Sequence, residues 1–489
     1  MADTQTEIDI ELIKRRAVTG VVTFTLRTLF VQLFTFIATF ILTILLEPTT
    51  FGIFFVVSAF INLFVYFSDI GLAAALIQKK EKPNHEDYKT TFTLQQLIVT
   101  TLVVIGLMLS SQIAAFYKLD EKGLFLIRAL LLSLILSSLK TIPTIMMERN
   151  LNFTKLVIPQ VIENITFYGA AVLLAMKGFG IASFSWAVIL RGILGLLTVY
   201  ILSPWKISIG LNKASLKELT RFGIPFQINS ILALLKDDLL TVFLGKILTF
   251  SQVGYIGWAQ KWAFIPLRFF MDNVNKITFP AYSRLQEHKA ELEKAIGKSI
   301  FFVTYLVYPA VFGMAAIAPG FINLVPSYEK WQPALPLLYL FGVNAIFSSV
   351  STTFTNTLFA IGRPKIVLNL MIFWTALTWG LTIPFTLKFG YIGAGLASAI
   401  VAATSTITIY FVKKEVNVAI GKNVFGPFFL SVIMFFIARS MIDYLPITKI
   451  SLISTVIFSV IIYFVFSFSL FKDHLKKDFI TIIKAIFTK

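Results

Sequence analysis

Long apolar runs, separated by short polar connectors, recur along the whole chain. Most runs have roughly 18–25 residues, enough for a helix to cross the roughly 30 Å hydrocarbon core of a bilayer. A transmembrane β-barrel would instead alternate apolar and polar residues in segments of about ten, and these runs do not alternate. The pattern predicts an all-α polytopic membrane protein.

The apolar runs predict about fourteen transmembrane helices. They cover approximately residues 20–46, 51–78, 88–115, 123–147, 155–176, 181–203, 222–247, 251–276, 298–324, 332–361, 365–387, 390–412, 424–443 and 450–471. The longest connector, about 277–297, has the pattern of a cytoplasmic amphipathic helix. The basic amphipathic tail, 473–489, either lies on the inner leaflet or stays in solvent and only enforces the topology.

Lysine and arginine are concentrated in every second connector and at the two ends of the chain. Membrane proteins retain positive residues on the cytoplasmic side, so we expect both termini there and an even number of spans. The net charge of +18 is thereby explained without nucleic acid as a partner. The chain has no cysteine, which excludes disulfides, thiolate metal sites and cysteine nucleophiles.

Two segments resemble each other and indicate an internal repeat. "EPTTFGIFFVVSAFINLFVYFSD" (47–69) and "LTFSQVGYIGWAQKWAFIPLRFFMD" (248–272) share a polar turn, an aromatic-rich helix and a closing aspartate, and Gly52 corresponds to Gly254. Both segments begin on the same side of the membrane, so the repeat is parallel, with an axis along the membrane normal. Transporters with a cavity between two halves are often built this way.

Charged residues lie within the eighth span, where they are costly and usually face a bundle interior or a wet cavity. At 100° per residue, one face carries Trp258, Lys261, Arg268, Asp272 and Asn275. Two cations, an aromatic ring and a carboxylate would suit a sugar that bears phosphate or carboxylate groups. Alternatively, the two cations pair with acids on neighbouring helices.

The first and second spans also carry polar faces. In the second span, Asn62 and Asp69 share a face with Ser58 and Tyr66. Arg27, near the inner end of the first span, either faces a polar cavity or extends to the headgroups. The first span has a stripe of small polar side chains that either lines water or packs helices closely: Thr25, Thr28, Gln32, Thr35, Thr39 and Thr43.

Two opposite charges lie in consecutive spans. Glu163 is in the fifth span and Arg191 is in the sixth. Charges within spans commonly pair with one another. We therefore interpret these two residues mainly as a structural ion pair, with a part in ion coupling as the alternative.

Three consecutive charges interrupt the seventh span at "LLKDDLL" (234–240). Asp237 and Asp238 share a polar face with Gln227, whereas Lys236 points nearly the opposite way. We expect the two acids to line the cavity, where they carry a proton or sodium ion or pair with basic residues of the eighth span. The reverse arrangement, with Lys236 towards substrate, stays open.

Motifs of catalysis and nucleotide binding are missing from the sequence. "GKS" at 297–299 lacks the upstream glycine of a phosphate-binding loop, because that position holds Leu292. The three histidines fall in predicted connectors or the tail and form no zinc motif. We therefore expect a protein that is not an enzyme, has no cofactor or metal, and draws energy from an ion gradient, the membrane potential or the substrate gradient.

Three segments have a recognisable composition and order: "FSDIGLAAALIQKKE" (67–81), "MMERNLNFTKL" (146–156) and "FLGKILTFSQVGYIGWAQKW" (243–262). They resemble loop and helix-end segments of bacterial polysaccharide flippases. The second contains the R-x-L-x-F pattern as Arg149, Leu151 and Phe153. One departure is Leu240, at a position before the exit of the seventh helix where relatives often have an acid.

By these motifs the chain resembles the polysaccharide transporters (Wzx-like, WzxC and teichuronic acid exporter type) of the multidrug/oligosaccharidyl-lipid/polysaccharide superfamily. The resemblance implies two six-helix lobes, residues 1–215 and 216–420, around a central cavity, then two further helices within 421–472. It implies alternating access by a monomer that moves undecaprenyl-pyrophosphate-linked oligosaccharide to the outer leaflet of the bacterial inner membrane. The lipid-linked oligosaccharide and membrane lipids would be partners, as would a polysaccharide polymerase and glycosyltransferases. Cationic cavity residues would contact the pyrophosphate or acidic sugars, and Arg27, Lys261 and Arg268 are the candidates, chosen from their positions in the spans rather than from any motif match.

Other functions fit the sequence less well. A drug or cation antiporter of the same superfamily would need a carboxylate-centred cavity with few cations. A lipid II flippase is mechanistically close, but the loop motifs are more similar to the polysaccharide branch. An envelope glycosyltransferase or polymerase typically needs a large extramembrane catalytic loop, and no connector is long enough to supply one.

Overall fold

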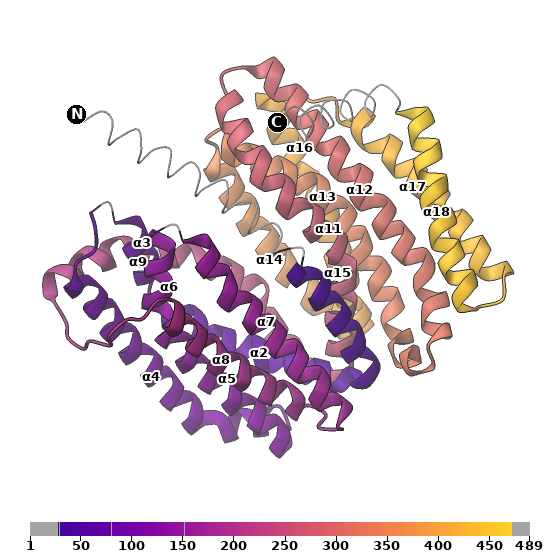
Figure 1. The fold of residues 1–489 in the computed structure, drawn as a ribbon. Coiled ribbons are helices and arrows are strands. Elements are labelled where there is room, and N and C mark those ends of the chain that lie inside the picture. Colours follow the sequence, from indigo (N-terminus) through magenta and orange to yellow (C-terminus); the bar gives the residue numbers. More distant parts are fainter. Residues whose placement is uncertain (1–27, 29, 80, 151, 472–489) are drawn as a thin grey trace. The chain divides into compact units, whose positions relative to one another are not determined.

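The computed structural model describes residues 28, 30–79, 81–150 and 152–471. Most of these residues lie in helices, and none of them forms a β-strand. The chain divides into two compact units, a first unit of residues 1–254 and a second unit of residues 255–489 (Figure 1).

The first unit consists of a helix over Phe30–Leu45 and nine further helices among the described residues. These are α2 (Pro48–Ser68), α3 (Leu72–Gln78), α4 (His85–Phe116), α5 (Glu121–Leu139), α6 (Thr141–Arg149), α7 (Phe153–Met176), α8 (Ala182–Leu202), α9 (Lys213–Lys236) and α10 (Asp238–Ile247). α8 packs against α7 and α5, and α5 packs against α4 (Figure 1). The start of α4 is capped by Asn84 and Asp87, each side chain bonding the other's backbone N–H.

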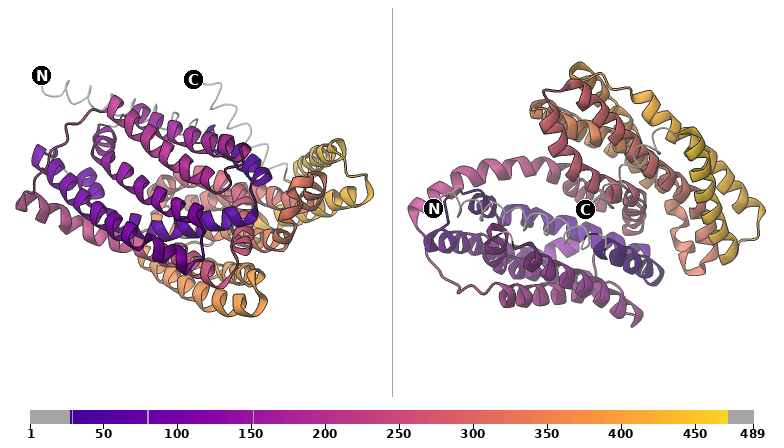
Figure 2. Two further views of the ribbon diagram at one scale, coloured as in Figure 1. Left: turned by 90° about the horizontal axis from the view of Figure 1, so that it is seen from below. Right: turned by 45° about the horizontal axis from the view of Figure 1, so that its top comes forward.

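The second unit begins within α11 (Phe250–Leu285). The elements that follow are α12 (Lys289–Leu324), a 3-10 helix η1 (Pro326–Ala334), α13 (Leu335–Ala360), α14 (Pro364–Phe389), α15 (Tyr391–Thr404), α16 (Ile407–Glu415), α17 (Ile420–Tyr444) and α18 (Lys449–Leu470). α12 packs along α17, and α17 packs along α18, which is drawn in yellow (Figure 2). Hydrogen bonds from Tyr463 of α18 to the Tyr305 carbonyl (2.8 Å), and between Tyr305 and Ser467 (2.8 Å), hold α18 on α12.

The predicted all-α, multi-pass fold is confirmed. Within the described residues, eleven helices are long and apolar enough to cross a membrane. The first, seventh and eighth predicted spans fall on Phe30–Leu45, on α9 with α10, and on α11. These three do not reach that length and apolarity, so the count of fourteen stays a prediction.

Four predicted spans are each divided into two α-helices, and in the twelfth the division falls at Ser405 and Thr406, between α15 and α16. Gly71, with φ of +80°, separates α2 from α3, a backbone conformation that favours glycine. Lys140 separates α5 from α6. Asp237 separates α9 from α10, so the division of the seventh span coincides with its charges. Hydropathy averaged over a whole span does not locate such breaks, although charges mark the one in the seventh span.

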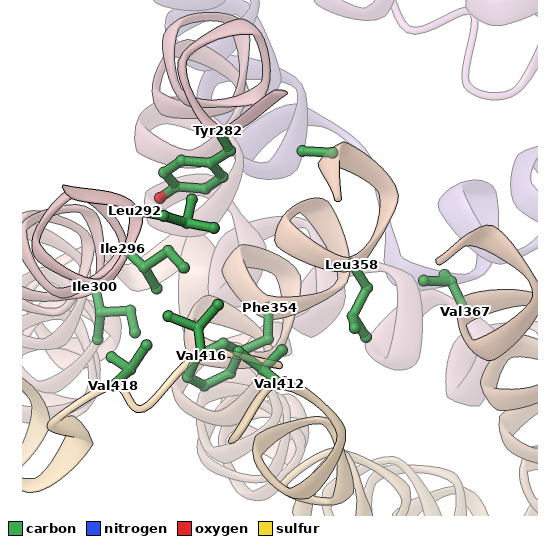
Figure 3. Packing of buried hydrophobic residues seen from close by; sticks show 11 residues of the cluster. Tyr282, Leu292, Ile296, Ile300, Phe354, Leu358, Val367, Val412, Val416 and Val418 are labelled. Carbon is green, nitrogen blue, oxygen red and sulfur yellow. The ribbon is translucent and has the colours of Figure 1, made fainter. Parts of the chain in front are cut away.

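The long cytoplasmic connector predicted at 277–297 is not a separate helix, and that prediction was wrong. α11 continues to Leu285 and α12 begins at Lys289, so only a short turn joins them. Tyr282 and Leu292, from the two helix extensions, are both buried in one apolar cluster with Ile296 (Figure 3). Burial of these side chains stabilises the extended helices.

The seventh span lies with the first unit. α9 packs against α3 and α4, and α10 packs against α2. The sequence-based boundary at residue 215 placed this span in the second lobe, whereas the compact units divide after Gly254. The division into lobes of six helices stays a prediction.

The starts of α2 and α11 approach each other closely through two glycines. A Cβ atom on Gly52 would lie 1.8 Å from the carbonyl oxygen of Phe250. A Cβ atom on Gly254 would lie 2.0 Å from the carbonyl oxygen of Pro48. Real Cβ atoms essentially never come within 3.0 Å of another heavy atom. Only residues without a side chain therefore permit this approach.

This reciprocal glycine contact joins positions that the internal repeat equates. Beside the glycines, the hydroxyl oxygens of Thr49 and Ser251 lie 2.6 Å apart, and these residues are 202 positions apart, as are Gly52 and Gly254. Each glycine meets the backbone that precedes the other glycine. The same contact is thus made twice in opposite senses, as in an interface with two-fold symmetry.

Candidate functional site

The polar faces predicted on the second and seventh spans meet in the first unit. Asn62 on α2 donates a hydrogen bond from Nδ2 to Oδ1 of Asp238 on α10, at 3.0 Å. One helical turn further along α2, the carbonyl oxygen of Tyr66 accepts a hydrogen bond from the Gln227 side chain. We call these four residues the α2–α10 polar contact. It brings a carboxylate, two side-chain amides and a backbone carbonyl group together between helices of the first unit.

The charges of "KDDLL" lie at helix ends rather than in the middle of one helix. Lys236 is the last residue of α9, and Asp238 is the first residue of α10. The partial charges at helix termini favour a cation at a C-terminus and an anion at an N-terminus. Asp237, in the turn between them, has an exposed side chain, and Lys236 and Asp238 are half-buried. The break therefore accommodates all three charges without requiring them to pair with one another.

Asp69 has a structural set of hydrogen bonds. Its Oδ1 accepts from the backbone N–H groups of Leu72 at 2.8 Å and Ala73 at 3.3 Å, and so caps the start of α3. Next to it, a Cβ atom on Gly71 would lie 2.1 Å from the carbonyl oxygen of Gly223 on α9. The Asp69 carboxylate thus binds the backbone of α3, and its predicted place in a substrate cavity stays a prediction.

Two of the segments that carry the family resemblance contact each other. The guanidinium of Arg149 donates to the carbonyl oxygens of Leu76 (2.5 Å), Ile77 (3.0 Å), Lys79 (2.8 Å) and Glu81 (3.0 Å). The last carbonyl groups of a helix lack intrahelical partners. Arg149 donates hydrogen bonds to such carbonyl groups at the end of α3. The arginine of the second motif thereby holds the end of the first motif in place.

Lys79 extends this anchored end to two other helices. Its Nζ lies 2.9 Å from Oε2 of Glu218 on α9 and 3.1 Å from Oδ2 of Asp87 on α4. The hydrogen bond to Glu218, aided by Asp87, raises the pKa of Lys79 although burial opposes this. The end of α3 is therefore held by charge as well as by hydrogen bonds to Arg149.

Glu163 binds two cations rather than one. Its Oε1 contacts Nζ of Lys140, and its Oε2 lies 3.5 Å from Nε of Arg191. Because Glu163 and Arg191 lie in consecutive spans, we expected an ion pair between them. Lys140 was missed, because the break between α5 and α6 that positions it gives no hydropathy signal. A Cβ atom on Gly195 would lie 2.3 Å from Glu163 Oε1, so glycine makes room for the carboxylate.

α11 presents Lys261 and Arg268 on one face. Arg268 is exposed, Lys261 is half-buried, and the two are close enough for their charges to interact. The adjoining face of α11 packs Met271 against Val303 of α12 and Ala345 of α13. A basic face thus lies beside an apolar core on the same helix.

Trp258, predicted to face substrate, is buried. It is 6% exposed and stacks on Trp331 of η1, with ring centroids 5.5 Å apart. Its indole Nε1–H lies 3.5 Å from the hydroxyl of Tyr328. The helical wheel places Trp258 on the same face of α11 as Lys261. It could not indicate that η1 covers Trp258.

Some predicted site residues cannot be placed. Arg27 and Leu151 lie outside the described residues, as does the tail 473–489. Phe153 and Asp272 lie in described helices, but their side chains are outside the described part of the structure. Their roles stay predictions.

The second unit contains an apolar cavity of about 650 Å³ between α12, α13, α16 and α17. Its wall is mainly aromatic and aliphatic, with Phe312, Phe347 and Phe428 among the lining residues. A few hydroxyl groups, including those of Ser351 and Thr406, also line it. This volume is within the range of cavities that bind small molecules, and its surface suits an apolar ligand.

Comparison with known proteins places this architecture in a family. Residues 41–336 match the family described as "Polysaccharide biosynthesis protein". The chain is 25% identical over 378 residues to the lipopolysaccharide biosynthesis protein WzxC of Escherichia coli (strain K12), which covers 75% of each chain. It is 23% identical over 369 residues to the succinoglycan biosynthesis transport protein ExoT of Rhizobium meliloti (strain 1021), covering 75% of this chain and 72% of ExoT.

A solved structure shares the fold. The lipid II flippase MurJ, in an inward closed conformation, matches with a TM-score of 0.75 and 16% identity, covering 92% of this chain and 99% of MurJ. The family match spans most of the first unit and the start of the second. The resemblance inferred from the sequence motifs is thereby confirmed, and the chain belongs to the polysaccharide biosynthesis protein family.

Proposed function

We propose that this protein is a flippase that moves an oligosaccharide linked to undecaprenyl pyrophosphate from the cytoplasmic to the outer leaflet of the bacterial inner membrane. WzxC is named for lipopolysaccharide biosynthesis and ExoT for succinoglycan transport. Membership of the polysaccharide biosynthesis protein family, together with a multi-pass helical fold like that of a lipid II flippase, supports transport rather than catalysis.

The observation that carries the proposal is the basic face of α11. Lys261 and Arg268 lie on one face of a helix whose adjoining face packs into an apolar core. Two neighbouring cations within a membrane bundle are costly unless water or an anionic group faces them. A pyrophosphate or an acidic sugar would provide that anion, and the guanidinium of Arg268 could bind it through two hydrogen bonds.

The test measures flipping of a fluorescent polyprenyl-pyrophosphate oligosaccharide by the full chain in liposomes. We expect Arg268→Ala to lose at least tenfold in rate while remaining inserted and folded. Arg284→Ala is the matched control, because Arg284 is an exposed arginine near the end of the same helix. Equal flipping by both variants would show that the basic face does not bind substrate.

The same assay separates the alternatives. Lipid II as substrate tests a lipid II flippase, and cationic dyes with an ion gradient test a drug antiporter. We expect neither to be moved at a rate comparable to that of the lipid-linked oligosaccharide. Faster movement of either would replace the proposed substrate class.

The apolar cavity of the second unit offers a place for part of the lipid carrier. Its aromatic and aliphatic wall suits an isoprenoid chain rather than a sugar. Gly342 lines this cavity, so Gly342→Leu would fill part of it. We expect that variant to flip a long-chain carrier more slowly than a short-chain carrier. An equal effect on both carriers would exclude the cavity as a lipid site.

The α2–α10 polar contact is the proposed site of energy coupling. Asp238, bonded to Asn62 and beside the exposed Asp237, can gain or lose a proton or hold a sodium ion at the break between α9 and α10. Movement of α10 relative to α2 would then depend on the occupancy of this carboxylate. We further propose that the protein works as a monomer with both termini in the cytoplasm, beside a polymerase and glycosyltransferases of the same polysaccharide.

A further inference from the structure

The ion cluster around Glu163 carries more positive than negative charge. Lys140 and Arg191 are both cations, and Glu163 is their only carboxylate partner within the described residues. Lys140 is 18% exposed and Glu163 is 11% exposed in their side chains, so these two form a largely buried pair. The Arg191 side chain is 51% exposed. The excess positive charge therefore lies on the exposed member of the cluster.

Arg191 makes only long contacts with other groups of the protein. It contacts Glu163 through Nε, at 3.5 Å, and its guanidinium carbon lies 5.9 Å from the ring centre of Phe167. Among the described residues its two terminal nitrogens make no hydrogen bond, and its nearest carboxylate contact is the one through Nε. The terminal nitrogens of a guanidinium form a fork that fits the oxygens of a phosphate.

The depth of Arg191 in the membrane makes this charge costly. It lies nine residues after the start of α8, about 14 Å along the helix axis at 1.5 Å per residue. Both α7 and α8 are apolar spans. An arginine at this depth is too far from either end of the span to extend fully to the headgroups, so an exposed guanidinium here favours contact with water or an anion.

Other polar groups lie on the same side of Arg191. The hydroxyl of Tyr168 on α7 is hydrogen-bonded to Thr35 and Thr39, and the Arg191 charge acts on it. Thr35 and Thr39 belong to the polar stripe of the first span. The Tyr168 hydroxyl therefore lies near Arg191, and this hydroxyl in turn contacts the polar stripe of the first span.

We propose that Arg191, with the Lys140–Glu163 pair behind it, binds the phosphate group of the transported lipid midway across the membrane. Lys140 neutralises Glu163, which leaves Arg191 able to accept an anion while Glu163 keeps its guanidinium oriented through Nε. The site differs from the basic face of α11, because it belongs to the first unit. It rests on the proposed function, since only a transported lipid brings a phosphate to this depth.

The first experiment measures binding to the purified full chain in nanodiscs, with farnesyl pyrophosphate, inorganic pyrophosphate and farnesol as probes. We expect farnesyl pyrophosphate to bind and Arg191→Gln to weaken its binding at least tenfold. Arg128→Gln, which changes another exposed arginine of a spanning helix in the same unit, should bind as the unchanged protein does. Binding of inorganic pyrophosphate alone would identify a free-phosphate site, and binding of farnesol alone would leave no role for the cation. Either result would overturn the proposal.

A second measurement avoids the risk that Arg191→Gln misfolds. Phenylglyoxal modifies exposed arginine side chains, and mass spectrometry reports the rate at Arg191 in the unchanged protein. Farnesyl pyrophosphate should slow modification of Arg191 but not of Arg128. If modification is not slowed while flipping of the lipid-linked oligosaccharide proceeds, the Arg191 site is wrong and the proposed function stands. If the unchanged protein neither binds farnesyl pyrophosphate nor flips the oligosaccharide, the proposed function fails as well.

Discussion

Replacing Gly52 by alanine should destabilise the protein strongly through the reciprocal glycine contact. The new Cβ would lie 1.8 Å from the carbonyl oxygen of Phe250, whereas ordinary contacts begin at 3.4 Å. The starts of α2 and α11 would have to separate by roughly 1.5 Å to restore an ordinary contact. The obstacle is backbone, so no side-chain rotation can relieve it. Overpacking typically costs 1–3 kcal/mol, and we expect about 3 kcal/mol here.

The assay is thermal unfolding of detergent-solubilised protein followed by size-exclusion chromatography. At about 2 °C per kcal/mol for a unit of this size, Gly52→Ala should lower the midpoint by about 6 °C. Gly169→Ala is the matched control, because a Cβ added there meets nothing within 4 Å and alanine is the better helix former. A second alanine at Gly254 should cost less in the Gly52→Ala background than alone, since the two segments are already apart.

Two outcomes would contradict the reciprocal glycine contact. If Gly52→Ala unfolds at the same temperature as Gly169→Ala, the two helix starts do not approach as closely as the structure shows. If the effects of Gly52→Ala and Gly254→Ala simply add, the two glycines do not share one contact.

Three further changes probe other contacts. A lysine at position 149 cannot donate to all four carbonyl oxygens at the end of α3, so Arg149→Lys should lower the free energy of unfolding by about 2–3 kcal/mol. A midpoint of thermal unfolding unchanged from the parent would contradict the anchoring role. Asp238→Asn keeps a side chain that Asn62 can bond but removes the charge, so flipping in liposomes should lose its dependence on a proton or sodium gradient; retained dependence would place coupling elsewhere. Tyr463→Phe removes the bond to the Tyr305 carbonyl and should cost about 1 kcal/mol in the same unfolding assay; Tyr444→Phe, an exposed tyrosine, should cost nothing measurable.

Helix faces could be predicted from the sequence, but the partners of those faces could not. The wheel put Asn62 on one polar face and Asp238 on another, and the structure joins them by a hydrogen bond. Periodicity gives the direction of a side chain about its own helix axis. It contains no information about which helix lies opposite, which is why Lys140 was missed as a partner of Glu163.

The sequence also could not predict which groups surround side chains near helix ends. Trp258 has the direction of a cavity residue, yet η1 covers it with Trp331. Asp69 shares the polar face of Asn62, yet the chain turns at Gly71 and brings backbone N–H groups to its carboxylate. In both cases a departure from regular α-helix geometry determines which groups surround the side chain. Hydropathy averages over such breaks and cannot locate them.

The reciprocal glycine contact also bears on the origin of the chain. A contact in which each glycine meets the backbone before the other has the form found in a homodimer with two-fold symmetry. In an ancestor of half this length, one mutation at that glycine would have altered both halves of the contact at once. Duplication and fusion of such an ancestor's gene would have released the two copies, so that Thr49 and Ser251 could diverge in sequence while their hydroxyl contact was retained. Glycine would have been kept at both positions, because a Cβ on either one would meet the backbone that precedes the other.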